Sequence, residues 1–498
     1  MNWLLPLIVI PLLASAGLAQ QTQQAHAAAS DPMQQQVEKL AAAVAQERAE
    51  LESSRSEIQQ LRLEIAEIRA DLAASHNSPH DNPSEMQSAS AAAQLRAEVG
   101  ALREQADVEQ SEIAVHEQAK VESESKFPVK LTGLILMNIF ANSSGVDVIQ
   151  SPAIATDAGG TTGLSLRQTV LGLDARGPHL LGATSSADVR VDFFGGLNQA
   201  GYTGATNVPR LRTAHAEIDW STTRAFIEMD RPIVNPNTPT SLTAIAEPAL
   251  AWSGNLWNWI PQLGAEHSFL RSDNSRFTVA AAIADVPDPA MQEASLTPTQ
   301  TASLAERSRW PGSEARIGYL RGDRTTGFQI GIGGYFSPHY ANADSHFDAW
   351  AATADYRIPV SSHFEVSGNL YRGLALGGLG GGTFKDYIYK HQGFYDVYAP
   401  LDDIGGWTQF KARANERLEF NVAYGMDNAF AGELRGNVTD IASTYQNIAR
   451  NSTVFTNMIF SPTAYTLFSL EYRRIDTSPV TGPHWISNVF GVAAGYRF

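Results

Sequence analysis

The side chains of this sequence best suited to act on dissolved ions are charged residues that alternate with apolar ones. Between residues 187 and 194, Asp188, Arg190 and Asp192 alternate with alanine, valine and phenylalanine. Successive residues of an extended chain point to opposite faces, so the charges share one face and the apolar residues the other. A face that carries both signs can hydrate and guide dissolved ions. The same alternation recurs at residues 405–415, 418–427 and 468–474.

We predict that these charged faces line a water-filled pore, because a basic residue facing lipid at the bilayer midplane costs about 2–4 kcal/mol. The mixture of signs favours a transverse field across the pore over a filter of one sign. Basic residues group on the later segments, which favours anionic solutes, although each could equally form an ion pair within the wall. The predicted pore-lining residues are Arg190, Arg316, Lys411, Arg413, Arg473, Asp188, Asp192 and Glu228.

Patterns typical of enzymes and cofactor sites are missing from the sequence. It contains no cysteine, which excludes disulfides and thiolate metal sites. A Gly-x-Ser-x-Gly nucleophile motif is absent, and the glycine-rich segment 377–382 lacks the strand-then-helix setting of a phosphate-binding loop. We therefore predict no enzyme activity, no cofactor and no metal site; a barrel lipase or protease is the alternative. A formal net charge of −16 over 498 residues argues against a nucleic-acid partner.

Short alternating segments that hold these residues fill the chain from residue 127 onwards. About sixteen can be placed, an even number, as bacterial membrane barrels have. Short turns and long polar connections separate them in alternation, so we predict an all-β transmembrane barrel of antiparallel strands over 127–498. The predicted strands begin near Val129, Ser165, Ser186, Leu211, Arg224, Ile260, Phe277, Glu314, Gly327, Phe347, Phe364, Gly406, Leu418, Thr453, Thr466 and Ser487.

The last strand, residues 487–498, has apolar or aromatic residues at every second position and ends on Phe498. A terminal aromatic residue resembles the assembly signal of bacterial outer-membrane barrels, which predicts the barrel-assembly machinery as a partner. The alternative is an edge strand of a soluble sheet.

The third long connection is the candidate for narrowing the pore. It is rich in proline and alanine and ends in several tryptophans. We expect it to fold into the barrel; the alternative is an external loop that covers the mouth. The candidate constriction residues are Arg231, Trp252, Asn255 and Trp257.

The N-terminal part of the sequence is typical of an export signal followed by a coiled coil. Residues 1–19 read as a signal peptide, with a retained membrane anchor as the alternative. Residues 20–126 form a predicted periplasmic stalk with helices at 37–72 and 89–119 and a proline-containing break between them. A seven-residue apolar repeat runs from Val37 to Leu72, and arginines at e with acids at g would let parallel copies associate in register. Isoleucine at both a and d between Ile58 and Ile68 favours three or more copies. A solvated single helix is the alternative.

Four short motifs resemble the DcaP-like porin family: RQTVLGLDARGP (167–178), VRVDFFGG (189–196), SGNLWNWIPQ (253–262) and SLEYRR (469–474). The resemblance implies a periplasmic coiled coil before a sixteen-stranded trimeric barrel and the uptake of small anions such as dicarboxylates. A phosphate-selective porin is a weaker resemblance, because no ladder of lumen lysines and arginines is evident. We therefore predict a homotrimeric outer-membrane porin in contact with membrane lipid, with peptidoglycan as a further candidate partner. The alternative is an envelope tether anchored by the barrel.

Overall fold

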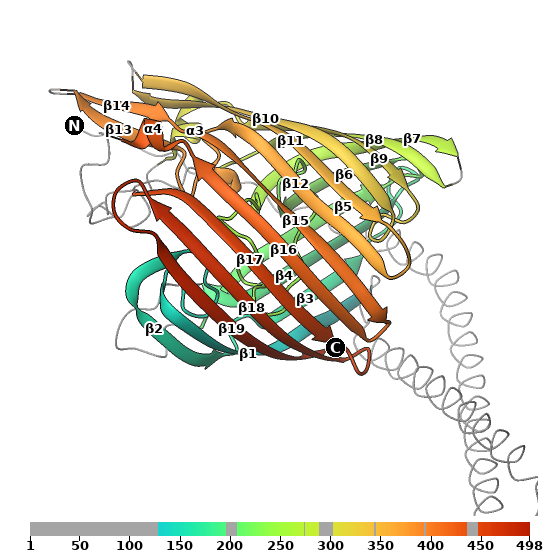
Figure 1. The fold of residues 1–498 in the computed structure, drawn as a ribbon. Coiled ribbons are helices and arrows are strands. Elements are labelled where there is room, and N and C mark those ends of the chain that lie inside the picture. The colour runs from blue at the N-terminus through green and yellow to red at the C-terminus, as the bar shows by residue number, and fades with distance from the viewer. Residues whose placement is uncertain are drawn as a thin grey trace, which may run out of the picture. The chain divides into compact units, whose positions relative to one another are not determined.

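A computed structural model describes residues 128–195, 207–272, 274–287, 302–342, 345–392, 395–435 and 447–498. The described residues form one large antiparallel sheet whose first strand, β1 (Val129–Val146), pairs with its last, β19 (Trp485–Arg497). This pairing closes the sheet into a barrel (Figure 1). The terminal Phe498 continues the seam by exchanging two backbone hydrogen bonds with Gly133.

The remaining elements follow in chain order. They are β2 (Ala155–Ser165), β3 (Val170–Arg176), β4 (Thr184–Gly195), β5 (Val208–Asp219), β6 (Thr223–Asp230), β7 (Ile260–Ser272), β8 (Ser275–Ala284), α3 (Leu304–Ser308), β9 (Gly312–Arg321), β10 (Phe328–Asn342), β11 (Ser345–Pro359), β12 (Phe364–Leu374), the 3-10 turn η2 (Gly377–Leu379), β13 (Tyr387–Gln392), β14 (Tyr395–Pro400), β15 (Asp402–Asn415), β16 (Leu418–Ala429), α4 (Ala431–Leu434), β17 (Ile448–Phe460) and β18 (Thr466–Pro479). Strands β13 and β14 form a separate hairpin. None of the described helices is long and apolar enough to span a bilayer.

The wall of the barrel has sixteen strand positions. The main sheet contains 17 strands among the described residues, but β2 and β3 pair with successive parts of β1 and form one interrupted strand. The interruption, residues 166–169, contains a turn in which the Thr169 N–H donates to the Leu166 carbonyl. A strand was expected to start near Ser165, and it starts earlier, at Ala155, because its first half is built of small residues without apolar alternation.

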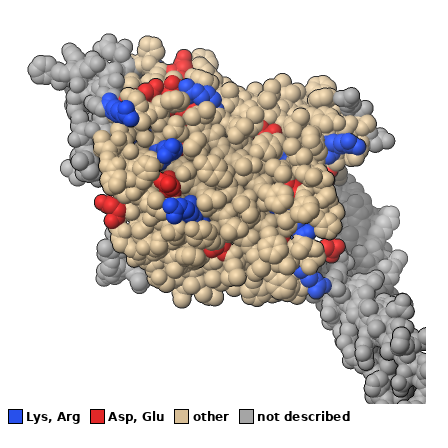
Figure 2. All heavy atoms as spheres, in the orientation of Figure 1, with Lys and Arg blue, Asp and Glu red and all other residues tan. Residues whose placement is uncertain are grey.

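The two faces of the wall differ as the alternation predicts. Outward-facing Val422 and Leu470 are 50% and 53% exposed, whereas their inward-facing neighbours Asn421 and Glu471 are 0% and 6% exposed. Figure 2 shows the outer surface over β10–β12 and β15–β19 with few, scattered charges. Such an outer surface suits lipid, because the hydrocarbon region solvates apolar side chains and excludes charge.

The connections at the two ends of the barrel differ in length. One end, here called the turn end, carries the short connections and the first and last residues of the wall. The other, the loop end, carries the longer connections together with β13, β14, α3 and α4. The turn end comprises residues 177–183, 220–222, 273–274, 322–327, 360–363, 416–417 and 461–465.

The predicted fold class is confirmed as a closed antiparallel barrel, and each predicted strand start lies in or beside an observed wall strand. Three of the long polar segments also contain structure that was not expected: the β13–β14 hairpin, α3 and α4. The predicted signal peptide (1–19) and coiled-coil stalk (20–126) lie outside the described residues and stay predictions.

Val422 offers a test of the outward face. Val422→Arg would place a guanidinium near the middle of the apolar surface and should lower the free energy of unfolding by about 2–4 kcal/mol. Val422→Ala should cost far less, because it adds no charge. Urea unfolding in lipid vesicles measures both, and equal losses in the two variants would contradict the assignment of this face to lipid.

Candidate functional site

The connection between β6 and β7, residues 231–259, here called the internal loop, lies inside the barrel. Its first part is bound to the inner faces of β9, β11 and β15. The Val234 N–H donates to Oε2 of Glu314 at 3.2 Å, and the Val234 carbonyl accepts from the Thr353 hydroxyl at 2.9 Å. Further along, the Thr240 N–H donates to Oε1 of Gln409 at 2.7 Å.

The second part of the internal loop reaches the opposite wall. Ser241 donates to Oε2 of Glu471 on β18 at 2.6 Å. The Gln168 side chain, in the interruption between β2 and β3, accepts from the Ile245 and Ala246 N–H groups at 2.7 and 3.1 Å. The loop is therefore attached around much of the inner circumference.

Backbone geometry lets the end of the loop approach the wall closely. Leu250 and Trp252 adopt positive φ angles of 63° and 56°. Gly254 has φ of 93°, and a Cβ there would lie 2.1 Å from the Gly406 carbonyl oxygen. Only glycine fits this position, because both the left-handed backbone and the space exclude a side chain.

The candidate constriction residues of the loop have different surroundings. Trp252 and Trp257 are buried, 4% and 6% exposed, and pack edge to face at 5.6 Å. Asn255 is fully buried and accepts from Nδ2 of Asn235 at 3.0 Å. Arg231, in contrast, faces a cavity. The tryptophans and Asn255 thus hold the loop in place, while Arg231 meets open space.

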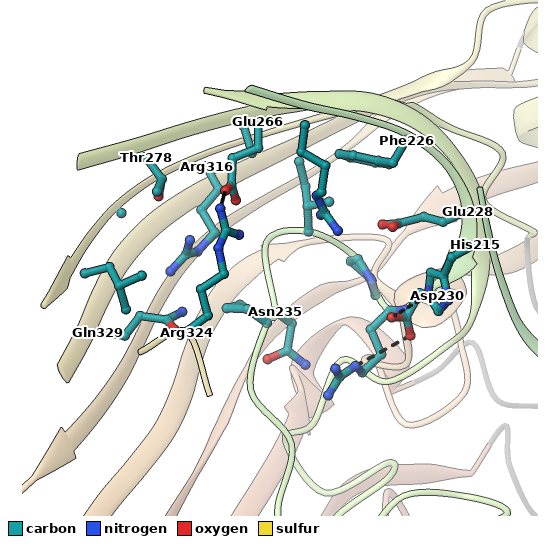
Figure 3. Close-up of a pocket in the computed structure, with 18 of the residues that line it drawn as sticks. His215, Phe226, Glu228, Asp230, Asn235, Glu266, Thr278, Arg316, Arg324 and Gln329 are labelled. Carbon is teal, nitrogen blue, oxygen red and sulfur yellow. Dashed lines mark hydrogen bonds and ion pairs between the residues drawn. The ribbon is translucent and has the colours of Figure 1, made fainter. Parts of the chain in front are cut away.

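This cavity, here called the lumen cavity, has a volume of about 410 Å³ and extends from the internal loop to the turn end. In Figure 3, Arg316, Arg324 and Gln329 lie on one side and Glu228, His215 and Asp230 on the other, with Asn235 on the loop between them. Its lining is therefore polar and carries both signs of charge. Five carboxylates and five arginines line it: Asp188, Glu217, Glu228, Asp230, Glu266, Arg224, Arg231, Arg316, Arg324 and Arg357.

The predicted pore-lining residues on early and middle strands lie at or near the lumen cavity. Asp188 contacts Nδ1 of His215 at 3.1 Å, and Arg190 pairs with Asp174 at 2.6 Å. Arg316 forms a bidentate pair with Asp355 at 2.9 and 2.7 Å.

Glu228 and Asp192 complete this early set. Glu228 lines the cavity and is 8% exposed. Asp192 is fully buried in a bidentate pair with Arg210 at 3.1 and 2.7 Å. The structure therefore brings Asp188, Glu228 and Arg316 to one cavity. Asp192, in contrast, is buried and does not line that cavity.

Basic residues on the later strands are neutralised by neighbouring carboxylates. Lys411 lies 3.8 Å from Glu419, and Arg413 lies 3.4 Å from Glu365. Arg473 pairs with Glu471 at 2.6 Å. An anion preference based on the number of these late-strand residues is therefore not supported by their surroundings, because carboxylates on the neighbouring strand, or on the same strand for Arg473, offset their charge.

A cluster of three arginines occurs elsewhere, in residues that the alternation did not identify. Arg167 lies 4.4 Å from the Phe194 ring, Arg210 lies 5.7 Å from Phe194 and 5.2 Å from Trp259, and Arg212 lies 4.9 Å from Trp259. These five residues are here called the arginine–aromatic stack. Guanidinium groups over aromatic faces are stabilised by the ring quadrupole.

Charge within the stack is only partly balanced. Arg210 has Asp192 as its ion-pair partner, whereas Nη1 of Arg212 is buried and contacts no acceptor among the described residues. Arg212 is the extra residue of a β-bulge, since Arg190 pairs with Thr213 and Val191 with Leu211. The bulge breaks the period of two, so the pattern in the sequence could not place this side chain.

Two acidic groups meet where the internal loop passes the connection after β1. Burial raises the pKa of Glu247 to about 8, and the nearby Asp147 adds to this rise. Burial likewise raises the pKa of Asp147, although its carboxylate accepts from the Ala153 and Ile154 N–H groups. Glu247 therefore holds a proton at neutral pH.

Gln168→Leu tests the attachment of the internal loop. The substitution removes Oε1, the one oxygen that accepts from both Ile245 and Ala246. Each unmatched buried N–H costs about 1–3 kcal/mol. Hydrogen exchange of these two amides should accelerate about tenfold or more. Gln329→Leu, which removes a single 3.3 Å contact to Asp355 away from the loop, should leave it unchanged. Equal exchange in the wild type and Gln168→Leu would contradict the attachment.

Glu247→Gln tests the protonated acid. Between pH 4.5 and 8 the folded state keeps a proton that the unfolded state releases, so stability should fall as pH rises through this window. Each tenfold difference in proton affinity corresponds to about 1.4 kcal/mol. Glu247→Gln should flatten this dependence in urea unfolding at pH 5 and 9, whereas Glu416→Gln in an exposed turn should not. The same pH dependence in the wild type and in Glu247→Gln would contradict the burial of a neutral acid at this position.

The fold of this chain is similar to those of several solved membrane barrels. The chain matches the outer membrane channel DcaP of Acinetobacter baumannii with a TM-score of 0.56 and 16% identity, over 76% of this chain and 99% of that chain. It also matches an anion-selective porin from Comamonas acidovorans (TM-score 0.45, 9% identity, 75% and 100% covered). A third match is Pseudomonas putida OprB (TM-score 0.44, 10% identity, 74% and 94% covered).

No protein-family model matches the chain, and no curated protein does. The chain has the sixteen-stranded barrel fold of the DcaP channel, as the resemblance of its motifs predicts.

Proposed function

We propose that the protein is an outer-membrane porin that lets small hydrophilic solutes cross, with a preference for anions such as dicarboxylates. The observation that carries the channel proposal is the internal loop, which is bound to the inner wall and leaves a polar cavity of about 410 Å³ beside it. A loop held inside a barrel sets the width of a pore and the charges that a passing solute meets.

The outer face supports the membrane part of the proposal. A closed barrel leaves no unpaired strand edge, and this wall presents large apolar side chains outward. The short connections would then face the periplasm and the long ones the exterior. This orientation puts the start of the barrel, and the predicted stalk before it, on the periplasmic side.

The anion preference rests on the arginine–aromatic stack. The stack brings three guanidinium groups together beside the internal loop, where Arg210 pairs with Asp192 at 2.7 Å and donates to the Ala246 carbonyl at 2.8 Å. Positive charge in a region of low dielectric attracts anions and repels cations. The mixed lumen cavity, with equal numbers of acids and arginines, does not itself favour either sign.

Self-association as a homotrimer is part of the same proposal. It is supported by the heptad pattern of the predicted stalk, in which acids at g and arginines at e would attract between parallel copies. Contact with peptidoglycan and recognition of Phe498 by the assembly machinery also remain proposals.

Planar bilayer recordings test the channel and its selectivity. The purified protein should give open steps, and its reversal potential in a salt gradient should have the sign of an anion-preferring pore. Arg212→Gln should lower the anion-to-cation permeability ratio severalfold, because it removes one of the three positive charges of the stack. Arg321→Gln makes the same charge change at the turn end and should have no such effect. A protein without open steps would rule out the channel, and an unchanged ratio in Arg212→Gln would rule out the stack as its selectivity element.

A further inference from the structure

A second polar site lies on the outside of the barrel, at the loop end. It is a groove of about 490 Å³ between the end of α3 and the hairpin of β10 and β11, here called the rim groove. One side is formed by Arg307, Ser308 and Arg309, and the other by the outward side chains of Tyr340, His346 and Asp348. Nothing in the proposed passage of solutes uses these residues.

The position of the rim groove follows from the side chains below it. Outward residues of β10 run from Phe328 through Ile330 and Ile332 to Phe336, which is 46% exposed. That run covers about 27 Å along the strand. Strands of membrane barrels tilt by about 40° from the barrel axis, so the run covers roughly 20 Å along that axis. The apolar band of such barrels is about 25 Å tall. The groove begins where this band ends.

Aromatic residues mark this boundary. Phe336 pairs across the strands with Trp350, which is 40% exposed, and Trp310 beside the groove is 73% exposed. Tyr340 pairs with His346 two outward positions further towards the loop end. Aromatic side chains collect at the level of lipid headgroups in membrane proteins. The rim groove therefore lies at headgroup height.

Within the part of the chain that the structure describes, neither arginine of the groove forms an ion pair with a carboxylate. Arg307 donates to the Ala341 carbonyl at 3.4 Å. Glu306 is the acid nearest to them in sequence. Its Oε2 accepts from the Ser303 N–H at 2.6 Å and so caps the N-terminus of α3. Arg309 ends α3 in the left-handed conformation, with φ of 64°. Two cations are thus held at one rim, and Asp348 is the one carboxylate among the described residues that line the groove.

We propose that the rim groove binds the phosphate headgroup of a lipid in the outer leaflet. Phosphate oxygens match the fork of guanidinium donors, and the acyl chains of the same lipid would lie on Phe336 and Trp350 below. The proposal rests on the membrane location proposed above but not on solute passage. Conductance and lipid binding can therefore fail independently of each other.

Lipid retention by the full-length protein in detergent tests this assignment. Native mass spectrometry with EDTA present would compare diphosphorylated lipid A, lipid A without its phosphates, and inorganic phosphate as competitor. The wild type should retain lipid A, and Arg307→Gln/Arg309→Gln should retain it about tenfold less, since each basic residue near an anionic headgroup adds measurable affinity. Asp348→Asn should retain more, because it removes the opposing charge.

The matched control is Arg176→Gln/Arg321→Gln, which removes two exposed arginines at the turn end and should bind lipid A as the wild type does. Heat-modifiable migration on gels verifies that every variant is folded, and bilayer conductance of the groove variants should be unchanged. Equal retention by the groove variant and the wild type, or equal binding of dephosphorylated lipid A, would overturn the proposal. Displacement by millimolar inorganic phosphate would identify a free-anion site instead and would overturn it as well.

Discussion

Hydrogen bonding of the backbone across the seam between β1 and β19 is the interaction on which the whole molecule depends. Lipid offers no partner for a free N–H or carbonyl group, so a sheet in a bilayer is stable only when it has no edge. Nine residue pairs join the first and last strands, and Phe498 extends the seam to Gly133. Once the sheet is closed, alternation divides every strand into a lipid face and an inner face.

Closure of the sheet also leaves an interior space, which the internal loop partly fills. A barrel of this size encloses more space than its own side chains can fill. Here much of the interior at the loop end is packed by connections, with Leu256, Leu376 and Leu379 fully buried against inward residues of the wall. Polar wall residues such as Gln168 and Gln409 bind the loop backbone instead of facing water. The lumen cavity, whose lining carries both signs of charge, stays open beside β4–β11.

The architecture could be predicted from the sequence because lipid imposes the same rule on every strand. Val422 and Leu470 had to face outward and Glu471 inward, and the structure places them so. The charge balance of the lumen could not be predicted, because it depends on which residues become neighbours across strands. Arg413 and Glu365 are 48 residues apart in sequence yet pair. A bulge displaces Arg212, so the period of two does not predict where its side chain points. The tryptophans of the internal loop lie outside any strand, so that period does not predict their burial either.

The long reach of the internal loop has a consequence for biogenesis. Its contacts join residues 80 to 230 positions apart, from Glu314 on β9 to Glu471 on β18. These anchors share one space only after the β-sheet has curled round on itself, so docking of the loop is a late event in maturation. A nascent barrel would pass through a wide, unobstructed stage before its interior narrows. The cell would then have to insert this protein without leaving such a leaky precursor open for long.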